Sequence, residues 1–503
     1  MFVKLRSAAP VGLSCLPVEV EVDINKGQTN FGIIGLTDTS IQEAKDRIHS
    51  AIKNSGYKYP FNFRILINLA PANLHKEGPA YDLPMAVGIV LASLGKEQNT
   101  EDTLMIGELA LDGSLRAVNG VLPIALFAKE KDIKNIIVPQ ENADEASLID
   151  GINVLPAKTL KEVVEHIIGE KTIELFIKKN NLPDEEIFSL DMSQIKGQEF
   201  TKRALEIAAS GGHNILLSGP PGSGKTLLAR TLPTILPSLT EKETLEITKI
   251  YSIAGLLRGG LIRKRPFRSP HHSISNVALV GGGSHPRPGE ISLAHRGVLF
   301  LDEFPEFNRG VLEALRQPLE DGTISISRAR GSIQFPALFI LVASQNPCPC
   351  GYASDPEQYC NCSASTLLKY QKKISGPILD RIDLHVEVPR LRFEKLSSTE
   401  NGEPSADIRK RVECARKIQR ARFFDTNITT NAEMGNNEIK KYCQLNSDSL
   451  NLLGEAVDKM HLSARAYNRI LKISRTIADL ANEKNISLNH LAEALQFRVK
   501  HNN

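Results

Sequence analysis

The pattern of apolar and polar residues divides the chain into segments that predict different secondary structure. Between residues 192 and 389, short apolar runs alternate with helical or looped segments, and three of these runs lie at 215–217, 298–301 and 338–343. Short apolar runs bounded by loops are typical of buried strands, and their alternation with helices predicts a doubly wound parallel sheet. Ligands of such sheets gather at the carboxyl ends of the strands. The middle of the chain is therefore predicted to be an α/β ligand-binding core.

The flanking segments follow other patterns. Residues 1–168 mix strand-like runs with helical stretches, which predicts a separate α/β domain. Residues 169–191 are charged and loop-like, as expected of a linker. A polar stretch ends the core near residue 395, and helical periodicity dominates the remainder. We thus expect a core at 192–395 and an all-helical domain at 396–503.

Composition narrows the class of protein. The chain is 41% hydrophobic, which is enough to form buried cores. Its length of 503 residues allows about three domains. Because the net charge is only +3, contact with nucleic acid would require a local basic surface. No stretch approaches a membrane span, and Met1 to Pro17 lacks a signal-peptide pattern, so we expect a cytoplasmic protein without membrane contact.

A complete phosphate-binding loop follows the first apolar run and precedes a helical segment. Glycines in such a loop let backbone N–H groups curl around phosphates at a helix N-terminus. Lys225 is placed to neutralise the β- and γ-phosphate oxygens, and the Thr226 hydroxyl to bind Mg²⁺. This pattern predicts a nucleotide site. Its residues are Gly219, Pro220, Pro221, Gly222, Ser223, Gly224, Lys225 and Thr226.

The two later apolar runs each end in residues suited to hydrolysis. The run at 298–301 ends in Asp302 and Glu303, which is a Walker B pattern. An aspartate in this place holds Mg²⁺, and the adjacent glutamate can polarise the attacking water. The run at 338–343 leads to Asn346 at the same edge of the sheet, where an amide can orient that water. We therefore expect an ATPase that uses Mg²⁺.

Four of the seven cysteines form two Cys-x-Cys pairs separated by nine residues. They are Cys348, Cys350, Cys360 and Cys362. Four thiolates match a closed tetrahedral zinc site, although the spacing within each pair is shorter than in the usual Cys-x₂-Cys motif. The alternatives are structural Zn²⁺ and unligated thiols, and the pattern favours zinc.

Two basic segments are candidates for DNA contact. The stretch from residue 258 to residue 272 has no acidic residue and carries Arg263, Lys264, Arg265 and Arg268 around Phe267. Basic side chains beside an aromatic ring can follow a phosphate backbone, while the alternative is a solvated loop. The second segment alternates apolar and polar residues on both sides of Arg328 and Arg330, which predicts a β-hairpin with a basic tip. A hairpin that only extends the sheet is the alternative here.

The core motifs together resemble the AAA+ superfamily, and specifically its Mg-chelatase-like ComM/YifB family. The strings that carry the resemblance are the phosphate-binding loop, Arg268 to His272, Gly297 to Glu303, Asn346 to Gly351 and Ile374 to Asp383. The resemblance implies a hexameric ring. It also implies that Arg381 is an arginine finger that reaches a neighbouring subunit's ATP, and that Arg465, or failing that Arg469, is the sensor 2 residue of a helical lid. In this family, the basic stretch corresponds to the helix 2 insert and the hairpin to the pre-sensor 1 hairpin.

The N-terminal domain resembles the Lon-protease-like, S5-like module of the same family. Ala80 in Gly78-Pro79-Ala80 stands where a Lon peptidase has its serine, and Leu122 stands where it has its lysine. Neither side chain can act as a nucleophile or base. We therefore expect no peptidase activity.

The resemblance implies a DNA motor that drives branch migration of recombination intermediates during natural transformation. Single-stranded or branched DNA and further copies of the chain are then the expected partners. One alternative is a magnesium chelatase ATPase subunit that remodels a protein partner. Another is an ATP-regulated scaffold, which the residues Glu303, Asn346 and Arg381 argue against because they serve hydrolysis.

Overall fold

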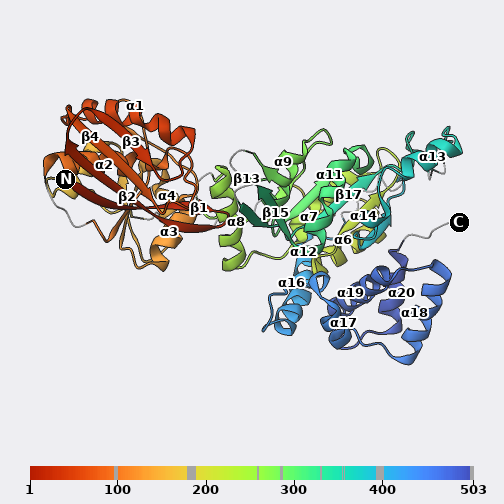
Figure 1. Ribbon diagram of the computed structural model, residues 1–503. Helices are drawn as coiled ribbons and strands as arrows, with labels where there is room; N and C mark the ends of the chain where they lie inside the picture. The colour runs from red at the N-terminus through yellow and green to blue at the C-terminus, as the bar shows by residue number, and fades with distance from the viewer. Residues whose placement is uncertain are drawn as a thin grey trace.

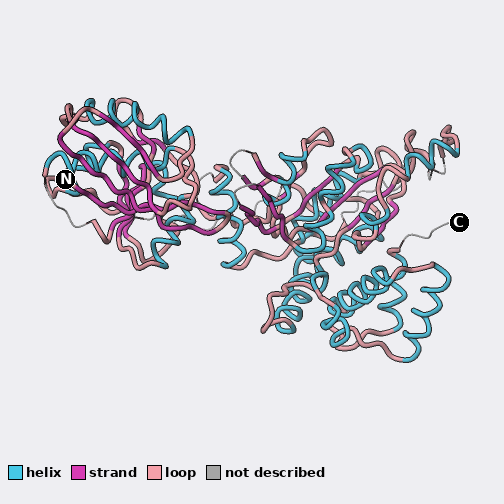
Figure 2. The backbone as a smooth tube through the Cα atoms, in the orientation of Figure 1, coloured by secondary structure: helices cyan, strands magenta, loops and turns pink. Residues whose placement is uncertain are grey.

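The structure is a computed structural model with an N-terminal domain, a central core and a C-terminal helical lid (Figure 1). Figure 2 shows strands in the first two parts and mostly helices in the third. The structure describes residues 1–95, 100–177, 189–257, 260–283, 287–328, 331–353, 355, 357–391 and 402–498. No helix among these residues is long and apolar enough to span a bilayer.

The N-terminal domain is built on a mixed sheet. Within the described residues it has seven strands in the order β3-β4-β2-β1-β5-β8-β9. The strands are β1 (Phe2–Val11), β2 (Ser14–Lys26), β3 (Asn30–Ile34), β4 (Phe63–Ala70), β5 (Thr103–Met105), β8 (Asn135–Pro139) and β9 (Asn153–Ala157). On β2, Val18, Val20 and Val22 are buried at every second position, so one face of this strand packs into the core.

Helices cover this sheet. They are α1 (Thr39–Asn54), α2 (Asp82–Leu94), α3 (Val121–Glu130), α4 (Ala143–Ala146) and α5 (Leu160–Ile167). Helix α2 is buried from Asp82 to Ala92 and packs with β1, β2 and β4 in one hydrophobic cluster. A helix that is apolar on all sides is stable only inside a core, which explains its central place.

The central core confirms the predicted doubly wound parallel sheet. Its five strands within the described residues run parallel in the order β11-β14-β17-β10-β18. They are β10 (Ile215–Ser218), β11 (Phe267–Arg268), β14 (Val298–Leu301), β17 (Ile340–Gln345) and β18 (Leu384–Glu387). The carboxyl ends of β10, β14 and β17 therefore lie side by side, as expected from the three apolar runs.

Several helices and one hairpin complete the core. The principal helices are α6 (Glu199–Gly211), α7 (Lys225–Ile235), α8 (Glu241–Ala254), α12 (Arg316–Asp321) and α13 (Ala364–Gln371). Strands β15 (Thr323–Arg328) and β16 (Gly331–Pro336) pair antiparallel, which confirms the predicted hairpin. Residues 329–330 at its tip, and the side chains of 327–331, lie outside what the structure describes.

The lid consists of helices, as predicted. They are α16 (Ser405–Arg422), α17 (Asn436–Tyr442), α18 (Ser447–Met460), α19 (Ala464–Leu480) and α20 (Leu488–Gln496). Core residues such as Ile215 and lid residues such as Ile470 and Leu491 belong to one hydrophobic cluster. The predicted linker falls partly on residues 178–188, and the core–lid boundary falls within 392–401. Both segments lie outside the described residues, so the domain limits stay predictions.

A buried polar group ties the lid to the core. Asp383 accepts from the backbone N–H of Asn214 at 3.1 Å and pairs with Arg469 of α19. His213 lies 3.3 Å from Asp383 and 2.8 Å from the Thr476 hydroxyl of the same helix. Burial alone would raise the pKa of Asp383, but the charge of Arg469 and the contact with His213 hold this pKa well below its usual range.

We expect Asp383→Asn to lower the free energy of unfolding of the core and lid by about 3 kcal/mol, because it leaves Arg469 buried without its counter-charge. Urea unfolding followed by circular dichroism measures this effect. The exposed Asp425→Asn is the matched control and should change stability by less than about 0.5 kcal/mol. Equal stability of the two variants would contradict a structural role for Asp383.

Candidate nucleotide site and its surroundings

The phosphate-binding loop lies between β10 and α7. Gly222 and Gly224 have φ angles of 76° and 89°, a region that favours glycine. Among the described residues, no atom lies within 4 Å of the place where a Cβ would stand on either glycine. The Ser223 hydroxyl oxygen is buried and has no hydrogen-bond partner in the described structure. An open loop with an unsatisfied buried hydroxyl fits a bound phosphate group.

Lys225 and Thr226 begin α7 and face the ends of the neighbouring strands. The Lys225 ammonium donates to the carbonyls of Gly219 at 2.7 Å and Pro220 at 2.9 Å, and to the Asn346 amide oxygen at 3.3 Å. Burial lowers the pKa of Lys225, and the charge of Asp302 opposes this shift. The Thr226 hydroxyl donates to Asp302 at 2.9 Å, so the two predicted Mg²⁺ ligands already lie together.

The end of β14 presents the predicted catalytic carboxylate. Glu303 has a φ of 53°, an uncommon left-handed conformation for a residue with a side chain. Its backbone N–H donates to Asp302 at 3.1 Å and to the Ser344 hydroxyl at 3.3 Å, and Ser344 itself donates to Asp302. The Glu303 side chain is 58% exposed and lies 3.4 Å from His272. Its carboxylate is therefore held at the strand end but open to water.

Ser344 and His272 are site residues that the sequence analysis did not single out for a role. Ser344 is buried on β17, one position before the end of the strand. His272 follows β11, and its ring lies tilted against that of His271, with ring centroids 4.0 Å apart. The sequence could have indicated both residues, because each lies at or just after the carboxyl end of a short strand, and these strand ends share one edge of the sheet.

The four clustered cysteines lie directly after Asn346. Their sulfur atoms all lie within 4.8 Å of one another. The Sγ atoms are 3.3 Å apart between Cys348 and Cys350, 3.7 Å between Cys348 and Cys360, and 3.6 Å between Cys350 and Cys360. A hydrogen bond from the backbone of Tyr352 lowers the pKa of Cys350 to about 6. This arrangement brings four potential metal ligands to one point.

Arg381 is buried and already has a carboxylate partner. Its guanidinium donates to the Pro377 carbonyl at 2.7 Å and pairs with Glu320 of α12. Glu320 also pairs with Arg465 of the lid at 3.4 Å, while Arg469 donates to the Arg381 carbonyl at 2.8 Å. The structure thus brings the predicted arginine finger, Arg381, close to the two candidates for the sensor 2 residue, Arg465 and Arg469, and Glu320 pairs with both Arg381 and Arg465.

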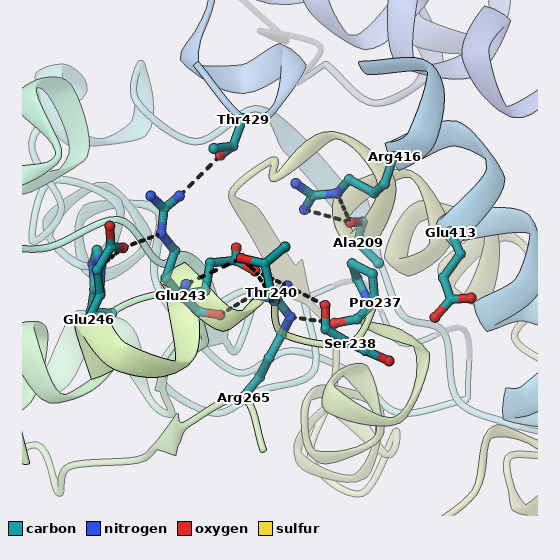
Figure 3. A network of polar contacts seen from close by, with 12 residues as sticks. Ala209, Pro237, Ser238, Thr240, Glu243, Glu246, Arg265, Glu413, Arg416 and Thr429 are labelled. Carbon is teal, nitrogen blue, oxygen red and sulfur yellow. Dashed lines mark hydrogen bonds and ion pairs between the residues drawn. The ribbon is translucent and has the colours of Figure 1, made fainter. Parts of the chain in front are cut away.

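These arginines line a cavity of about 450 Å³ between the core and the lid, and its lining includes no residue of the phosphate-binding loop. Arg265, Arg296 and Arg416 also line this cavity. Figure 3 shows Arg416 directed at the Ala209 carbonyl, to which it donates at 2.9 Å. Burial, followed by the charge of Arg265, lowers the pKa of Arg416 to about 9. Seven basic and four acidic side chains line the cavity, so positive charge exceeds negative charge in its walls.

Known proteins and family models match almost the whole length of the chain. Residues 191–396 match a family model described as magnesium chelatase, subunit ChlI, and residues 402–498 match its C-terminal counterpart. Residues 20–142 match a model described as subunit ChlI of Mg-chelatase. Competence protein ComM of Haemophilus influenzae is 45% identical over 499 residues, covering 98% of this chain and 96% of that protein. The chain belongs to the ComM/YifB family of magnesium-chelatase-like AAA+ ATPases.

Two further relatives describe the extent of this similarity. The YifB protein of Escherichia coli is 44% identical over 501 residues, covering 98% of this chain and 96% of that protein. Lon protease 2 of Bacillus subtilis is 32% identical over 171 residues, covering 31% of this chain and 30% of that protein. The resemblance of the chain to the ComM/YifB family is therefore confirmed, and the N-terminal domain is Lon-like.

The two residues that the sequence comparison predicts to stand at the Lon catalytic positions, Ala80 and Leu122, are apolar. Ala80 lies on the short helical turn η1 (Pro79–Tyr81), and Leu122 is buried on α3. Both side chains belong to or pack against one hydrophobic cluster of the N-terminal domain. The structure thus brings the two positions to the same region without a hydroxyl or amine on either of them.

The basic stretch divides into exposed and anchored residues. Arg263 and Lys264 are exposed. Arg265 is only 11% exposed and donates to the carbonyls of Pro237 and Arg296, both at 2.6 Å, while it pairs with Glu243 (Figure 3). Arg268 donates two hydrogen bonds to Glu290, each 2.6 Å long. Because the guanidinium groups of Arg265 and Arg268 pair with carboxylates of the chain itself, the exposed residues Arg263 and Lys264 are the better candidates for DNA contact.

The other predicted DNA residues belong to the hairpin. Arg330 and the side chain of Arg328 lie outside the described residues. The body of the hairpin is anchored, because Ile324, Ile326 and Phe335 are buried in the core.

Proposed function

We propose that this chain is an ATP-driven DNA motor that works as a hexameric ring and promotes branch migration of recombination intermediates in natural transformation. The observation that carries the ATPase part is the convergence of Thr226, Asp302, Glu303 and Asn346 beside one phosphate-binding loop. The DNA part rests on the relative named as a competence protein and on the exposed residues Arg263 and Lys264.

Within one subunit, each residue has a defined task. Thr226 and Asp302 would hold Mg²⁺, which would supply positive charge beside the phosphate oxygens of ATP. Lys225 leaves the loop carbonyls and pairs with those oxygens. Glu303 accepts a proton from the attacking water, and Asn346 orients that water. The partly exposed position of Glu303 supports this assignment, because water reaches its carboxylate.

Between subunits, Arg381 and Arg465 stabilise the charge that develops on the neighbour's γ-phosphate. Two observations support this part of the proposal. The cavity that holds both arginines is cationic, and it lies apart from the chain's own phosphate-binding loop. Glu320 pairs with both arginines in the single chain, so an incoming phosphate would replace one anion with another. Arg469 positions Arg381 through its carbonyl.

The experiment that tests the proposed function is ATP hydrolysis with and without single-stranded and branched DNA, followed by branch-migration assays on the same preparation. Hydrolysis that rises with DNA, together with movement of a branched substrate, is the expected result. Hydrolysis that is indifferent to both DNAs would reject the motor and leave an ATPase that acts on another partner.

We expect the double change Arg263→Ala and Lys264→Ala to weaken DNA binding without changing nucleotide binding. Two lost phosphate contacts should reduce the slope of log affinity against log salt by roughly 2. Fluorescence anisotropy at several salt concentrations measures this slope. Lys440→Ala with Lys441→Ala, an exposed pair on α17, is the matched control. An unchanged slope in the first variant would remove these residues from the DNA surface.

A magnesium chelatase ATPase subunit is the second candidate. The matches to three models described as chelatase subunits favour it. The Lon-like N-terminal domain does not separate the two candidates, because one of those models matches residues 20–142. Stimulation of hydrolysis by a protein partner and not by DNA would support this candidate.

The N-terminal domain is not a peptidase in this proposal. A Lon-type acyl transfer requires a serine and a lysine base, and Ala80 and Leu122 provide neither. Its contacts attach it instead to the core of the same chain. The Glu145 carboxylate of α4 accepts from the Ser252 hydroxyl of α8 at 2.5 Å, and the Gly120 N–H donates to the Ser252 carbonyl at 3.1 Å. The domain is thereby attached to the helix that leads into the basic stretch.

A further inference from the structure

The cysteine cluster touches two parts of the nucleotide site through the backbone. Cys348 follows Asn346 by two residues, and the Asn346 amide accepts from Lys225 at 3.3 Å. On the other side, Gly351 has a φ of 89° and lies against the phosphate-binding loop. A Cβ on Gly351 would stand 2.5 Å from the Pro221 Cδ, so only glycine allows this approach. The first Cys-x-Cys pair therefore sits between Asn346 and Pro221.

The second pair leads directly into the helix that faces the catalytic glutamate. Helix α13 begins after Cys362, and the Ser363 hydroxyl accepts from the Thr366 N–H at its start. Thr366, Lys369, Tyr370 and Lys373 line a cavity of about 400 Å³ whose other walls include Glu303 and Asn346. Helix α13 is short and largely exposed apart from Tyr370. Its position therefore depends on the cysteines that precede it and on the Lys373–Glu306 ion pair of 2.8 Å.

The sulfur geometry matches a bound metal ion better than a disulfide. Four sulfurs arranged tetrahedrally at a Zn–S distance of about 2.3 Å lie about 3.8 Å from one another. The three measured Sγ–Sγ distances of 3.3, 3.7 and 3.6 Å are near this value. A disulfide would need about 2.05 Å, and all four cysteines are free. Four thiolates without oxygen ligands favour zinc among the common divalent ions.

We propose that the four cysteines hold one Zn²⁺ and that this ion positions the ATP site. It would join α13 to two parts that the paired strands β10 and β17 already hold near each other: Pro221 of the phosphate-binding loop and Asn346 at the end of β17. Loss of the metal frees Asn346 and α13, so the attacking water loses its orientation while the phosphate-binding loop still binds nucleotide. The kinetic part of this inference rests on the proposed ATPase function.

The test compares full-length protein with the variants Cys360→Ser and Cys360→His. Wild-type protein should contain about one zinc per chain by mass-spectrometric metal analysis, because a closed four-thiolate site is filled during folding. Cys360→Ser should lose zinc and lower the turnover number for ATP at least tenfold, while affinity for a fluorescent ADP analogue changes less than threefold. Cys360→His retains a zinc ligand and should restore both zinc content and turnover. Cys414→Ser, an exposed and isolated cysteine, is the control and should change neither.

Hydrogen exchange measures the same coupling without turnover. Removing zinc from wild-type protein with a chelator should increase amide exchange in residues 219–226 and 364–371 and leave α2 of the N-terminal domain unchanged. Zinc-free wild-type protein as purified would overturn the metal site, and full turnover or unchanged exchange in zinc-free protein would overturn its positioning role. If the wild-type protein hydrolyses no ATP, the proposed function is wrong. The exchange measurement alone then tests whether zinc positions the phosphate-binding loop and α13.

Discussion

Glu303→Gln is expected to lower the turnover number for ATP by about 10² to 10⁴, the range that a general base contributes. The carboxylate at the end of β14 is open to water, and glutamine preserves its shape but cannot accept a proton. Nucleotide affinity should stay within a few-fold, because no described contact joins the Glu303 side chain to the phosphate-binding loop. Steady-state hydrolysis together with binding of a fluorescent ATP analogue measures both quantities.

Glu306→Gln is the matched control for this prediction. Glu306 lies three residues further on, lines the same cavity as Glu303, is 43% exposed and pairs with Lys373. Its replacement should reduce turnover far less than replacement of Glu303. Equal losses in the two variants would mean that negative charge near α13, and not proton transfer at Glu303, limits hydrolysis.

Arg381→Ala is expected to lower turnover by about 10³, the lower end of the effect of an arginine finger in related nucleotide hydrolases. The chain's own phosphate-binding loop does not line the cavity that holds Arg381, so the loss should arise at the site of a neighbouring subunit. Mixing inactive Arg381→Ala subunits with inactive Glu303→Gln subunits should therefore restore hydrolysis. An Arg381→Ala subunit has an intact Glu303, and its Glu303→Gln neighbour contributes the arginine.

Two controls separate a finger from a structural arginine. Mixing Glu303→Gln with Lys225→Ala should restore nothing, since both residues act at the site of their own subunit. Glu320→Gln removes the charge that pairs with Arg381 but should leave turnover within a few-fold. If Glu320→Gln is as inactive as Arg381→Ala and mixing restores no activity, the ion pair is structural and the finger assignment is wrong.

The sequence predicted the core of the fold because its signals are local. A buried strand, a glycine loop and a helix follow one another without interruption from 215 to 235, and the chain's covalent order alone places Lys225 and Thr226 at the helix start. The same holds for Asp302 and Glu303 at the end of β14. Parallel strands align their carboxyl ends, so Asn346 could be assigned to this edge without knowledge of any contact.

The sequence could not predict in the same way which arginines are exposed and which pair with carboxylates of the chain. Arg265 and Arg268 resemble Arg263 and Lys264 in sequence, but their partners Glu243 and Glu290 each lie 22 residues away. Arg381 meets Glu320 across 61 residues. Whether a basic side chain is anchored or exposed depends on which distant carboxylates the packing of helices brings near, and charge patterns along the chain do not contain this information.

The sequence by itself therefore determined the nucleotide-binding loop, the parallel sheet, the helical lid and the presence of four clustered cysteines, because contiguous residues specify each of these. Only the tertiary structure decided that Ser344 and His272 join Asp302 and Glu303, that Glu320 occupies the place between two arginines, and that the cysteines lie against Pro221. These arrangements require segments far apart in the chain to pack within a few ångströms, and the free energy that selects such packing is spread over the whole buried core.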